Sequence, residues 1–224
     1  MSLTGIFLIC TIVPLLFGLW AQMQVRRTFK RYSEVPTANG LTGAQAAASV
    51  MSSEGVTDVS IRPVEGRLSD HYDPRSKTLN LSEDVGVAAS VAAVGVAAHE
   101  AGHAVQDARG YKPMQIRSTL VPAASIGSQL WIFPAFIGLI LGSTGLVNVG
   151  LVLFLAVVLF QLVTLPVEFD ASKRAIVALE GGGLLGAQEL DGARKVLRAA
   201  ALTYIAALAA SIGQLIYFFL ASRR

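Results

Sequence analysis

The chain has 224 residues, of which 53% are hydrophobic and 15% are charged, and its mean hydropathy is +0.57. An average soluble domain has about 25% charged residues, so this composition excludes an ordinary soluble domain and favours a membrane protein. The single cysteine, Cys10, excludes an intrachain disulfide and a cysteine-rich zinc site.

Three long tracts lack Asp, Glu, Lys and Arg, and together they predict four membrane spans. The tracts are residues 1–25, 118–167 and 199–222. A helix that crosses a bilayer needs about 20 apolar residues, so the first and last tracts each contain one span. The middle tract is interrupted at Gly142-Ser143-Thr144-Gly145 and contains two. The predicted spans are 4–22, 119–141, 147–165 and 200–220. The first is expected to be an anchor, because no charged region precedes it as in a cleaved signal peptide.

Basic residues lie beside one set of span ends, and cytoplasmic loops of membrane proteins have this bias. They are Arg26, Arg27, Lys30, Arg31, Arg109, Lys112, Arg117, Lys173, Arg174, Arg194, Lys195 and Arg198. The sequence therefore predicts that segments 26–117 and 168–198 face the cytoplasm and that the N-terminus faces outside. Arg223 and Arg224 at the far end of the last span depart from this rule. Because the basic residues do not alternate with aromatic ones in a patch, nucleic-acid binding is not expected.

The first polar segment begins with two predicted helices. Residues 23–34 continue the first span as a helix, and Val35-Pro36 ends it, because the residue before a proline disfavours helical geometry. Thr42-Gly43-Ala44-Gln45 is a capping-box pattern for an Ala-rich helix that ends at Gly55.

Two short strands are predicted next. Residues 56–64 and 77–82 alternate weakly between apolar and polar side chains and contain β-branched residues. Residues 68–76 between them are polar and are expected to form a loop or the end of a hairpin. The later polar segment, 168–198, is expected to be helical with a break at the glycines 181–183.

His99-Glu100-Ala101-Gly102-His103 is the most informative pattern, an HExxH motif in a chain with three histidines. Positions i and i+4 of a helix share one face, so both imidazoles can bind one Zn²⁺ while Glu100 faces the metal-bound water as general base. Random placement in this composition would produce such a motif roughly once in a thousand chains. An uncharged Ala/Val-rich run from Val85 predicts one helix that continues through the motif to Gly110.

A third zinc ligand is required, because catalytic zinc usually has three protein ligands and one water. Few other histidines or cysteines are available, so a carboxylate is favoured. Glu168 is the first charged residue after two spans, and two crossings return the chain to the side of His99. Asp191 is the alternative, because Leu190-Asp191-Gly192 is similar to a signature of site-2-type intramembrane metalloproteases. Position alone leaves both open.

Four segments, in order along the chain, resemble the YugP-type neutral zinc metallopeptidases of bacterial membranes. They are 68–79, 96–107, 165–172 and 200–206. That family is similar to the HtpX-like gluzincins, whose third ligand is a glutamate in an E-x-x-A-D pattern, so the resemblance implies that Glu168 is the third ligand. Ser172 departs from that pattern, because it replaces the aspartate that orients a ligand histidine. Asp170 or Asp107 is therefore expected to supply that contact.

The loop residues His71 and Tyr72 are candidates for a catalytic or substrate-binding role. A peptidase needs a hydrogen-bond donor near the developing oxyanion, and the neighbouring strand could pair with an extended substrate. The alternative is a capped surface loop in which Asp73-Pro74 supplies turn chemistry.

These patterns predict a mainly α membrane protein with about four transmembrane helices and a small α+β cytoplasmic zincin-like domain that contains the HExxH helix. Residues 1–224 are expected to form one metallopeptidase domain in the bacterial plasma membrane, with one Zn²⁺ per chain. Its expected partners are the lipid bilayer and polypeptide substrates, either misfolded or membrane-associated. The alternative functions are a non-catalytic membrane interaction protein with structural or no zinc and a site-2-type intramembrane metalloprotease. The oligomeric state stays open.

Overall fold

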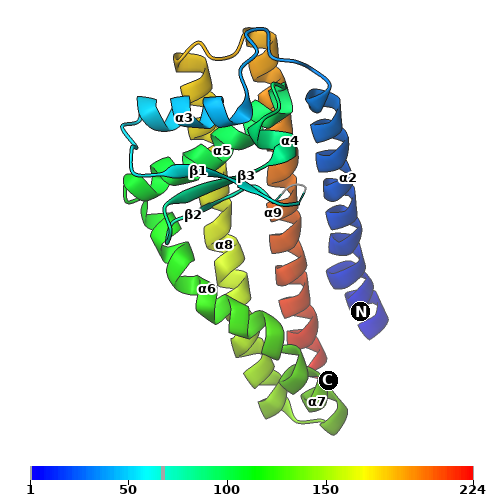
Figure 1. Cartoon of the computed structure of the whole chain (residues 1–224). Helices are drawn as coiled ribbons and strands as arrows, with labels where there is room; N and C mark the ends of the chain where they lie inside the picture. Colours follow the sequence, from blue (N-terminus) through cyan, green and yellow to red (C-terminus); the bar gives the residue numbers. More distant parts are fainter. Residues whose placement is uncertain (1, 67–68, 224) are drawn as a thin grey trace. The chain divides into compact units, whose positions relative to one another are not determined.

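The structure is a computed structural model that describes residues 2–66 and 69–223. It is mainly helical (Figure 1), and the described chain divides into two compact units. The apolar unit comprises Met1–Gln22, Pro113–Pro166 and Leu202–Arg224. The mixed unit comprises Met23–Lys112 and Val167–Ala201 and contains both helices and strands.

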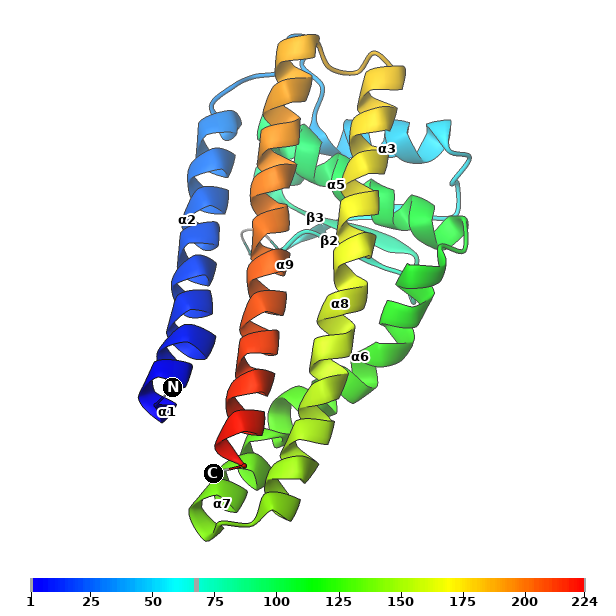
Figure 2. The ribbon, with the colours of Figure 1, turned by 180° about the vertical axis from the view of Figure 1, so that it is seen from behind.

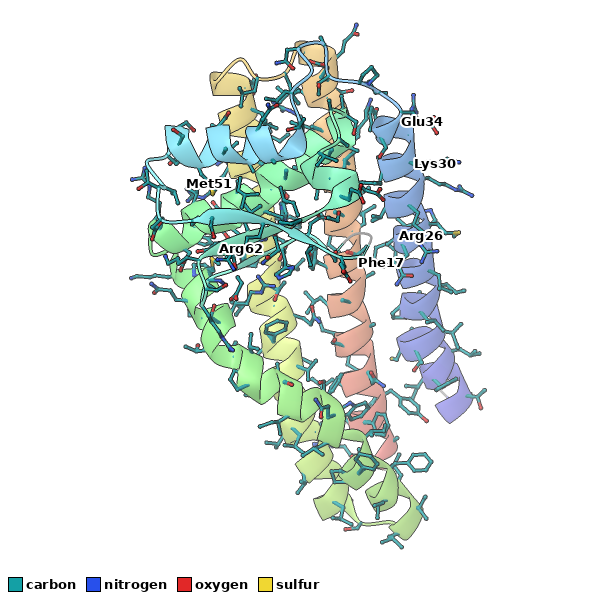
Figure 3. All side chains as sticks on the ribbon, viewed as in Figure 1. Phe17, Arg26, Lys30, Glu34, Met51 and Arg62 are labelled. Atoms are coloured by element: carbon teal, nitrogen blue, oxygen red, sulfur yellow. The ribbon has the colours of Figure 1, made fainter. Side chains whose placement is uncertain are left out.

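Four helices of the described chain are long and apolar enough to cross a membrane, as predicted. They are Thr4–Ser33, Lys112–Leu141, Thr144–Gly181 and Ala187–Ala221. The first comprises α1 (Leu3–Phe7), the π-helical turn η1 (Leu8–Ile12) and α2 (Val13–Ser33). The second comprises α6 (Lys112–Leu130) and α7 (Ile132–Leu141). The third is α8 (Thr144–Gly181) and the fourth is α9 (Ala187–Ala221). Along α2, the apolar Phe17 is followed by Arg26 and Lys30 (Figure 3), and the helix ends at Ser33, which confirms that it continues beyond the first span.

The second predicted span is divided, because α6 ends at Leu130 and α7 begins at Ile132. Pro134 explains the break: it has no N–H to donate, and its ring would clash with the carbonyl of Leu130 four residues earlier. Trp131 at the break packs against Phe154 and Phe218, with ring centroids 4.4 and 5.1 Å away. This aromatic cluster is the core of the apolar unit.

The C-terminal part of α9, from Leu202, belongs to the apolar unit. The turn between α7 and α8 and the end of α9 line the same cavity of about 740 Å³, and Ser143 and Ser222 are among its lining residues. Both views place the C-terminal end of helix α9 beside α7 (Figures 1 and 2). Phe7 of α1 lies 5.5 Å from the ring of Tyr217 in α9, so the first helix packs along the last.

In the mixed unit, α3 (Gly43–Ser53) begins with the predicted capping box. The Thr42 hydroxyl accepts from the backbone N–H of Gln45, and the Gln45 side chain accepts from the backbone N–H of Thr42. These two bonds satisfy N–H groups that a helix start otherwise leaves unpaired.

The prediction of one continuous helix from Val85 is wrong at its beginning. The structure has a short α4 (Glu83–Gly86) and then α5 (Val91–Ala108), which the side chain of Ser90 caps. The connection between them is extended because its backbone pairs with the chain after α2: Ala89 accepts from Thr37, and Val91 donates to Val35. The predicted end is confirmed, since Gly110 has a φ of +62° directly after the helix.

The strands of the described chain form one three-stranded sheet in the order β1-β3-β2. The predicted strands are confirmed as β1 (Ser60–Val64) and β3 (Thr78–Ser82), which are parallel. Residues 68–76 were expected to form a loop or the end of a hairpin, and the hairpin alternative is confirmed, because β2 (His71–Asp73) forms there and pairs antiparallel to β3. Leu68 of that loop lies outside the described residues. The segment pairs because a tight turn at 74–77 returns the chain onto it, which makes β2 an edge strand.

Helices α8 and α9 both pack against α5. An added Cβ at Gly102 of α5 would lie 2.6 Å from the carbonyl oxygen of Ala171, so the backbones of α5 and α8 are in close contact there. In α9, Arg194 forms an ion pair of 2.9 Å with Glu180 of α8. The glycine break between these helices is confirmed, because α8 ends at Gly181 and Gly183 has a φ of +61°.

Candidate metal centre

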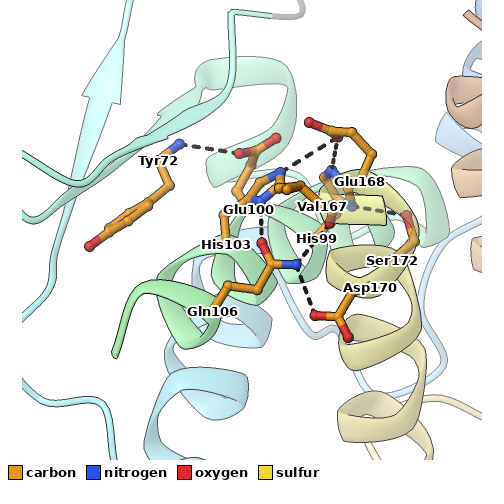
Figure 4. Close-up of polar contacts among 9 residues, drawn as sticks. All are labelled: Tyr72, His99, Glu100, His103, Gln106, Val167, Glu168, Asp170 and Ser172. Atoms are coloured by element: carbon orange, nitrogen blue, oxygen red, sulfur yellow. Dashed lines mark hydrogen bonds and ion pairs between the residues drawn. The ribbon is translucent and has the colours of Figure 1, made fainter. Parts of the chain in front are cut away.

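The two motif histidines and Glu168 meet within the mixed unit (Figure 4). His99 and His103 lie one turn apart on α5, and Glu168 projects from α8. The Oε2 atom of Glu168 is 3.2 Å from Nε2 of His99 and 3.6 Å from Nε2 of His103. This proximity depends on the close approach of the two helices at Gly102.

The donor set fits a zinc ion. One nitrogen from each imidazole and one carboxylate oxygen lie within 4.8 Å of one another, and the described residues contain this group as a candidate metal site. His103 and Glu168 are buried, whereas the side chain of His99 is 13% exposed. Two imidazoles and one carboxylate leave one tetrahedral position for water, which is the arrangement of catalytic zinc. These three residues are therefore the candidate ligands of one zinc ion, and the partly exposed His99 lies at the solvent side of the group.

Glu100 lies beside these three residues and is held by the edge strand. Its Oε2 accepts a hydrogen bond of 3.2 Å from the backbone N–H of Tyr72 in β2. Burial raises the pKa of the Glu100 carboxyl, although the two neighbouring imidazoles act in the opposite direction. A carboxyl with a raised pKa is a better proton acceptor in its ionised form, which suits a general base.

The imidazole nitrogens that face away from Glu168 have polar partners. Nδ1 of His99 lies 3.1 Å from the hydroxyl oxygen of Ser172, and Nδ1 of His103 lies 3.0 Å from Oε1 of Gln106. Ser172 stands where the related pattern has an aspartate, and its hydroxyl makes the contact with a ligand histidine that the aspartate would make. The sequence reasoning did not identify Gln106, although its place three residues after His103 puts both on one helical face.

Asp170 and Asp107, which were expected to orient a ligand histidine, form hydrogen bonds with other side chains. Asp170 accepts from the amide of Gln106 at 2.9 Å and from Nε of Arg174 at 2.6 Å, so it reaches His103 through Gln106. Asp107 accepts from the phenol of Tyr72 and from Nζ of Lys77, both at 2.8 Å. Asp107 thus ties the edge strand to α5 instead of supporting an imidazole directly.

His71 and Tyr72 point to different sides of β2. The exposed His71 has Nδ1 2.7 Å from the carbonyl oxygen of Ser69 and Nε2 3.2 Å from Nδ2 of Asn80. The ring of Tyr72 is buried, and burial together with the hydrogen bond to Asp107 raises the pKa of its phenol. Of the two residues, Tyr72 contacts Glu100, and it does so through its backbone.

Asp191, the alternative third ligand, lies elsewhere in the mixed unit. It is exposed on α9 and forms an ion pair of 2.6 Å with Lys195, one turn along the same helix. The candidate metal group contains Glu168 and not Asp191.

The comparisons with known proteins agree with a metal centre of this kind. Residues 7–223 match the family described as "Putative neutral zinc metallopeptidase", so the chain belongs to this zinc metallopeptidase family. It is 41% identical over 213 residues to the "Putative membrane protease YugP" of Bacillus subtilis (strain 168), and the match covers 95% of each chain. No solved structure matches. The resemblance noted from the sequence motifs is confirmed, and membership implies zinc as the metal.

Proposed function

We propose that this protein is a membrane-embedded, zinc-dependent endopeptidase of the gluzincin type, with its active site at the cytoplasmic membrane face. One observation carries the proposal. His99, His103 and Glu168 bring their ligand atoms within 4.8 Å of one another, with the carboxyl of Glu100 directly beside them. A structural zinc site would need a fourth protein ligand and no general base, so this arrangement favours catalysis over the non-catalytic alternative.

In the proposed mechanism, His99, His103 and Glu168 hold one zinc ion. Bound zinc would supply Lewis-acid polarisation of the scissile carbonyl and acidify a water. Glu100 accepts the proton of the attacking water and then delivers it to the leaving amine, and these steps need a carboxyl that stays aimed at the site. The hydrogen bond from the Tyr72 N–H restrains that carboxyl.

The edge strand β2 is a candidate platform for the substrate. The N–H of Tyr72 points away from β3 and toward Glu100, so this edge of the sheet faces the catalytic group. An extended polypeptide can add to an exposed edge through main-chain hydrogen bonds, which tolerates many side chains. Misfolded or membrane-associated polypeptides in extended form are therefore the proposed substrates, and His71 on the exposed side of β2 is a candidate substrate contact.

The catalytic test replaces Glu100 with Gln in the purified full-length protein. Zinc content should stay at one ion per chain, because Glu100 is not a ligand, and hydrolysis of casein should fall by about 10²–10⁴-fold, the usual contribution of general-base catalysis. Glu65→Gln is the matched control, since Glu65 is exposed. Hydrolysis by zinc-loaded Glu100→Gln at the wild-type rate would contradict the mechanism.

The cytoplasmic position of the site is tested by cysteine labelling in a Cys10→Ala background. Glu65 and Gly181 are suitable positions, because the first is exposed and an added Cβ at the second meets no atom within 4 Å. Cysteines there should be protected from a membrane-impermeant thiol reagent in intact cells and should label after permeabilisation. Labelling of both in intact cells would place the peptidase on the outer face.

A further inference from the structure

Gln106 is a buried polar side chain with three hydrogen-bond contacts. Its side chain is fully buried on α5, and its Oε1 lies 3.0 Å from Nδ1 of His103. Its Nε2 donates to the carbonyl oxygen of Val167 at 2.8 Å and to Oδ2 of Asp170 at 2.9 Å, both on α8 (Figure 4). The amide therefore joins one ligand histidine to the helix that contains Glu168.

The orientation of this amide follows from its partners. A backbone carbonyl and a carboxylate that pairs with a cation can accept hydrogen bonds but cannot donate them, and Oδ2 of Asp170 lies 2.6 Å from Nε of Arg174. The NH₂ group of Gln106 must therefore face Val167 and Asp170. The reverse orientation would place the amide oxygen against two acceptors and leave buried polar groups without hydrogen bonds, which is unfavourable.

The orientation in turn determines the tautomer that a neutral His103 adopts. The amide oxygen can only accept, so Nδ1 of His103 must carry the hydrogen in this contact. A neutral imidazole has one N–H, which leaves the lone pair on Nε2, the atom that lies 3.6 Å from Glu168. The network thus presents Nε2, and not Nδ1, to a metal.

We propose that Gln106 is a positioning residue of the metal centre, which fixes the Nδ1–H tautomer of His103 and holds α5 against α8 beside Glu168. This inference rests on the proposed zinc site. Asp170 and Arg174 affect His103 indirectly, through Gln106, because they determine which end of the amide faces the histidine.

The two histidines differ in this respect. Nδ1 of His99 contacts the hydroxyl of Ser172, and a hydroxyl can either donate or accept. Ser172 therefore imposes no tautomer on His99, whereas Gln106 imposes one on His103. Replacement of Ser172 by Ala should consequently weaken zinc binding less than replacement of Gln106.

The first experiment measures zinc affinity of the full-length protein in detergent, by competition with a chromophoric chelator. Gln106→Met keeps a similar volume but removes the acceptor and both donors, and zinc affinity should fall about 10- to 100-fold, as is usual when a partner of a ligand histidine is removed. Gln45→Met is the control, because it breaks the capping box of α3 in the same unit and should leave zinc affinity unchanged. Wild-type zinc affinity in Gln106→Met would overturn the inference.

The second experiment needs no variant at Gln106. With ¹⁵N-histidine labelling, NMR of the zinc-loaded wild-type protein should show His103 bound through Nε2, with an Nδ1–H that exchanges slowly with water. The chain has three histidines, so assignment by His71→Asn and by Ser172→Ala is practical. Zinc on Nδ1 of His103 would overturn the inference even if Gln106→Met failed to fold.

The outcomes separate this inference from the proposed function. If the wild-type protein binds zinc through Nε2 of His103 and depends on Gln106 but hydrolyses no peptide, the positioning role stands and the peptidase proposal fails. If the wild-type protein is an active peptidase whose zinc affinity is indifferent to Gln106, the positioning role fails alone.

Discussion

Replacement of Gly102 by Ala should weaken zinc binding without unfolding the protein. Gly102 lies within the motif, between the two histidines, where α5 approaches α8. The added Cβ would lie 2.6 Å from the carbonyl oxygen of Ala171. A close carbon–oxygen contact is about 3.3 Å, so the helices must separate by about 0.7 Å at this point.

Two effects on stability nearly cancel. Overpacking of a close contact costs about 1–3 kcal/mol, while alanine is favoured over glycine inside a helix by about 1 kcal/mol. The net loss of unfolding free energy should therefore be about 0–2 kcal/mol. Thermal unfolding of the zinc-free protein, followed by circular dichroism in detergent, measures it.

The effect on the metal centre should be larger. Zinc–ligand distances tolerate deviations of about 0.2 Å, so a separation of about 0.7 Å would remove Glu168 from ligand distance unless the helix relaxes. The contact of Ser172 with His99, now 3.1 Å, would also lengthen beyond hydrogen-bond distance. We expect zinc affinity to fall at least about tenfold, which corresponds to about 1.4 kcal/mol.

Gly181→Ala is the control, because Gly181 also lies in a helix and an added Cβ there meets no atom within 4 Å. It should leave zinc affinity unchanged and should not lower the unfolding free energy, because alanine is favoured over glycine in a helix. If Gly102→Ala binds zinc with wild-type affinity while remaining folded, the close approach of α5 and α8 does not position Glu168, and the packing argument for the site is wrong.

Three further outcomes are expected. Glu168→Ala should release most of the zinc measured by metal analysis, because two imidazoles alone hold the ion weakly; retention of one ion per chain would contradict the ligand assignment. Tyr72→Phe removes the hydrogen bond to the charged Asp107 and should lower the unfolding free energy by about 1.5–3 kcal/mol, since bonds to charged groups are the stronger ones; an unchanged denaturant midpoint would show that this bond contributes nothing. Cysteines at Ser143 and Ser222 should label equally from outside the cell, because both line the same cavity of the apolar unit; protection of Ser222 would show that the last helix does not cross.

Features encoded by neighbouring residues were predictable. The apolar tracts predicted four helices of membrane-spanning length because charge exclusion and length are local properties of the chain. The capping box at Thr42 and the glycine break near Gly183 were likewise visible, since each depends on a few adjacent residues. The HExxH pattern placed two histidines on one helical face because helical geometry alone sets that spacing.

Features that depend on distant residues were missed or misplaced. The chain between α4 and α5 has the composition of a helix. Its backbone instead forms hydrogen bonds with Val35 and Thr37, which precede α3 in the sequence. The strand β2 forms in a polar segment because β3 pairs with it. In both cases tertiary hydrogen bonds outweigh the weak local preference.

The sequence by itself determined the class of protein and the residue types of its centre: an apolar chain with four long helices, and one helix on which two histidines and a glutamate share a face. The tertiary structure decided which other residues join them. Glu168 is 69 residues from His99, and Gln106 reaches Val167 and Asp170 across a similar separation. Such contacts arise where α5 and α8 pack closely at Gly102, and the separation of their backbones is a property of packing that no local pattern encodes.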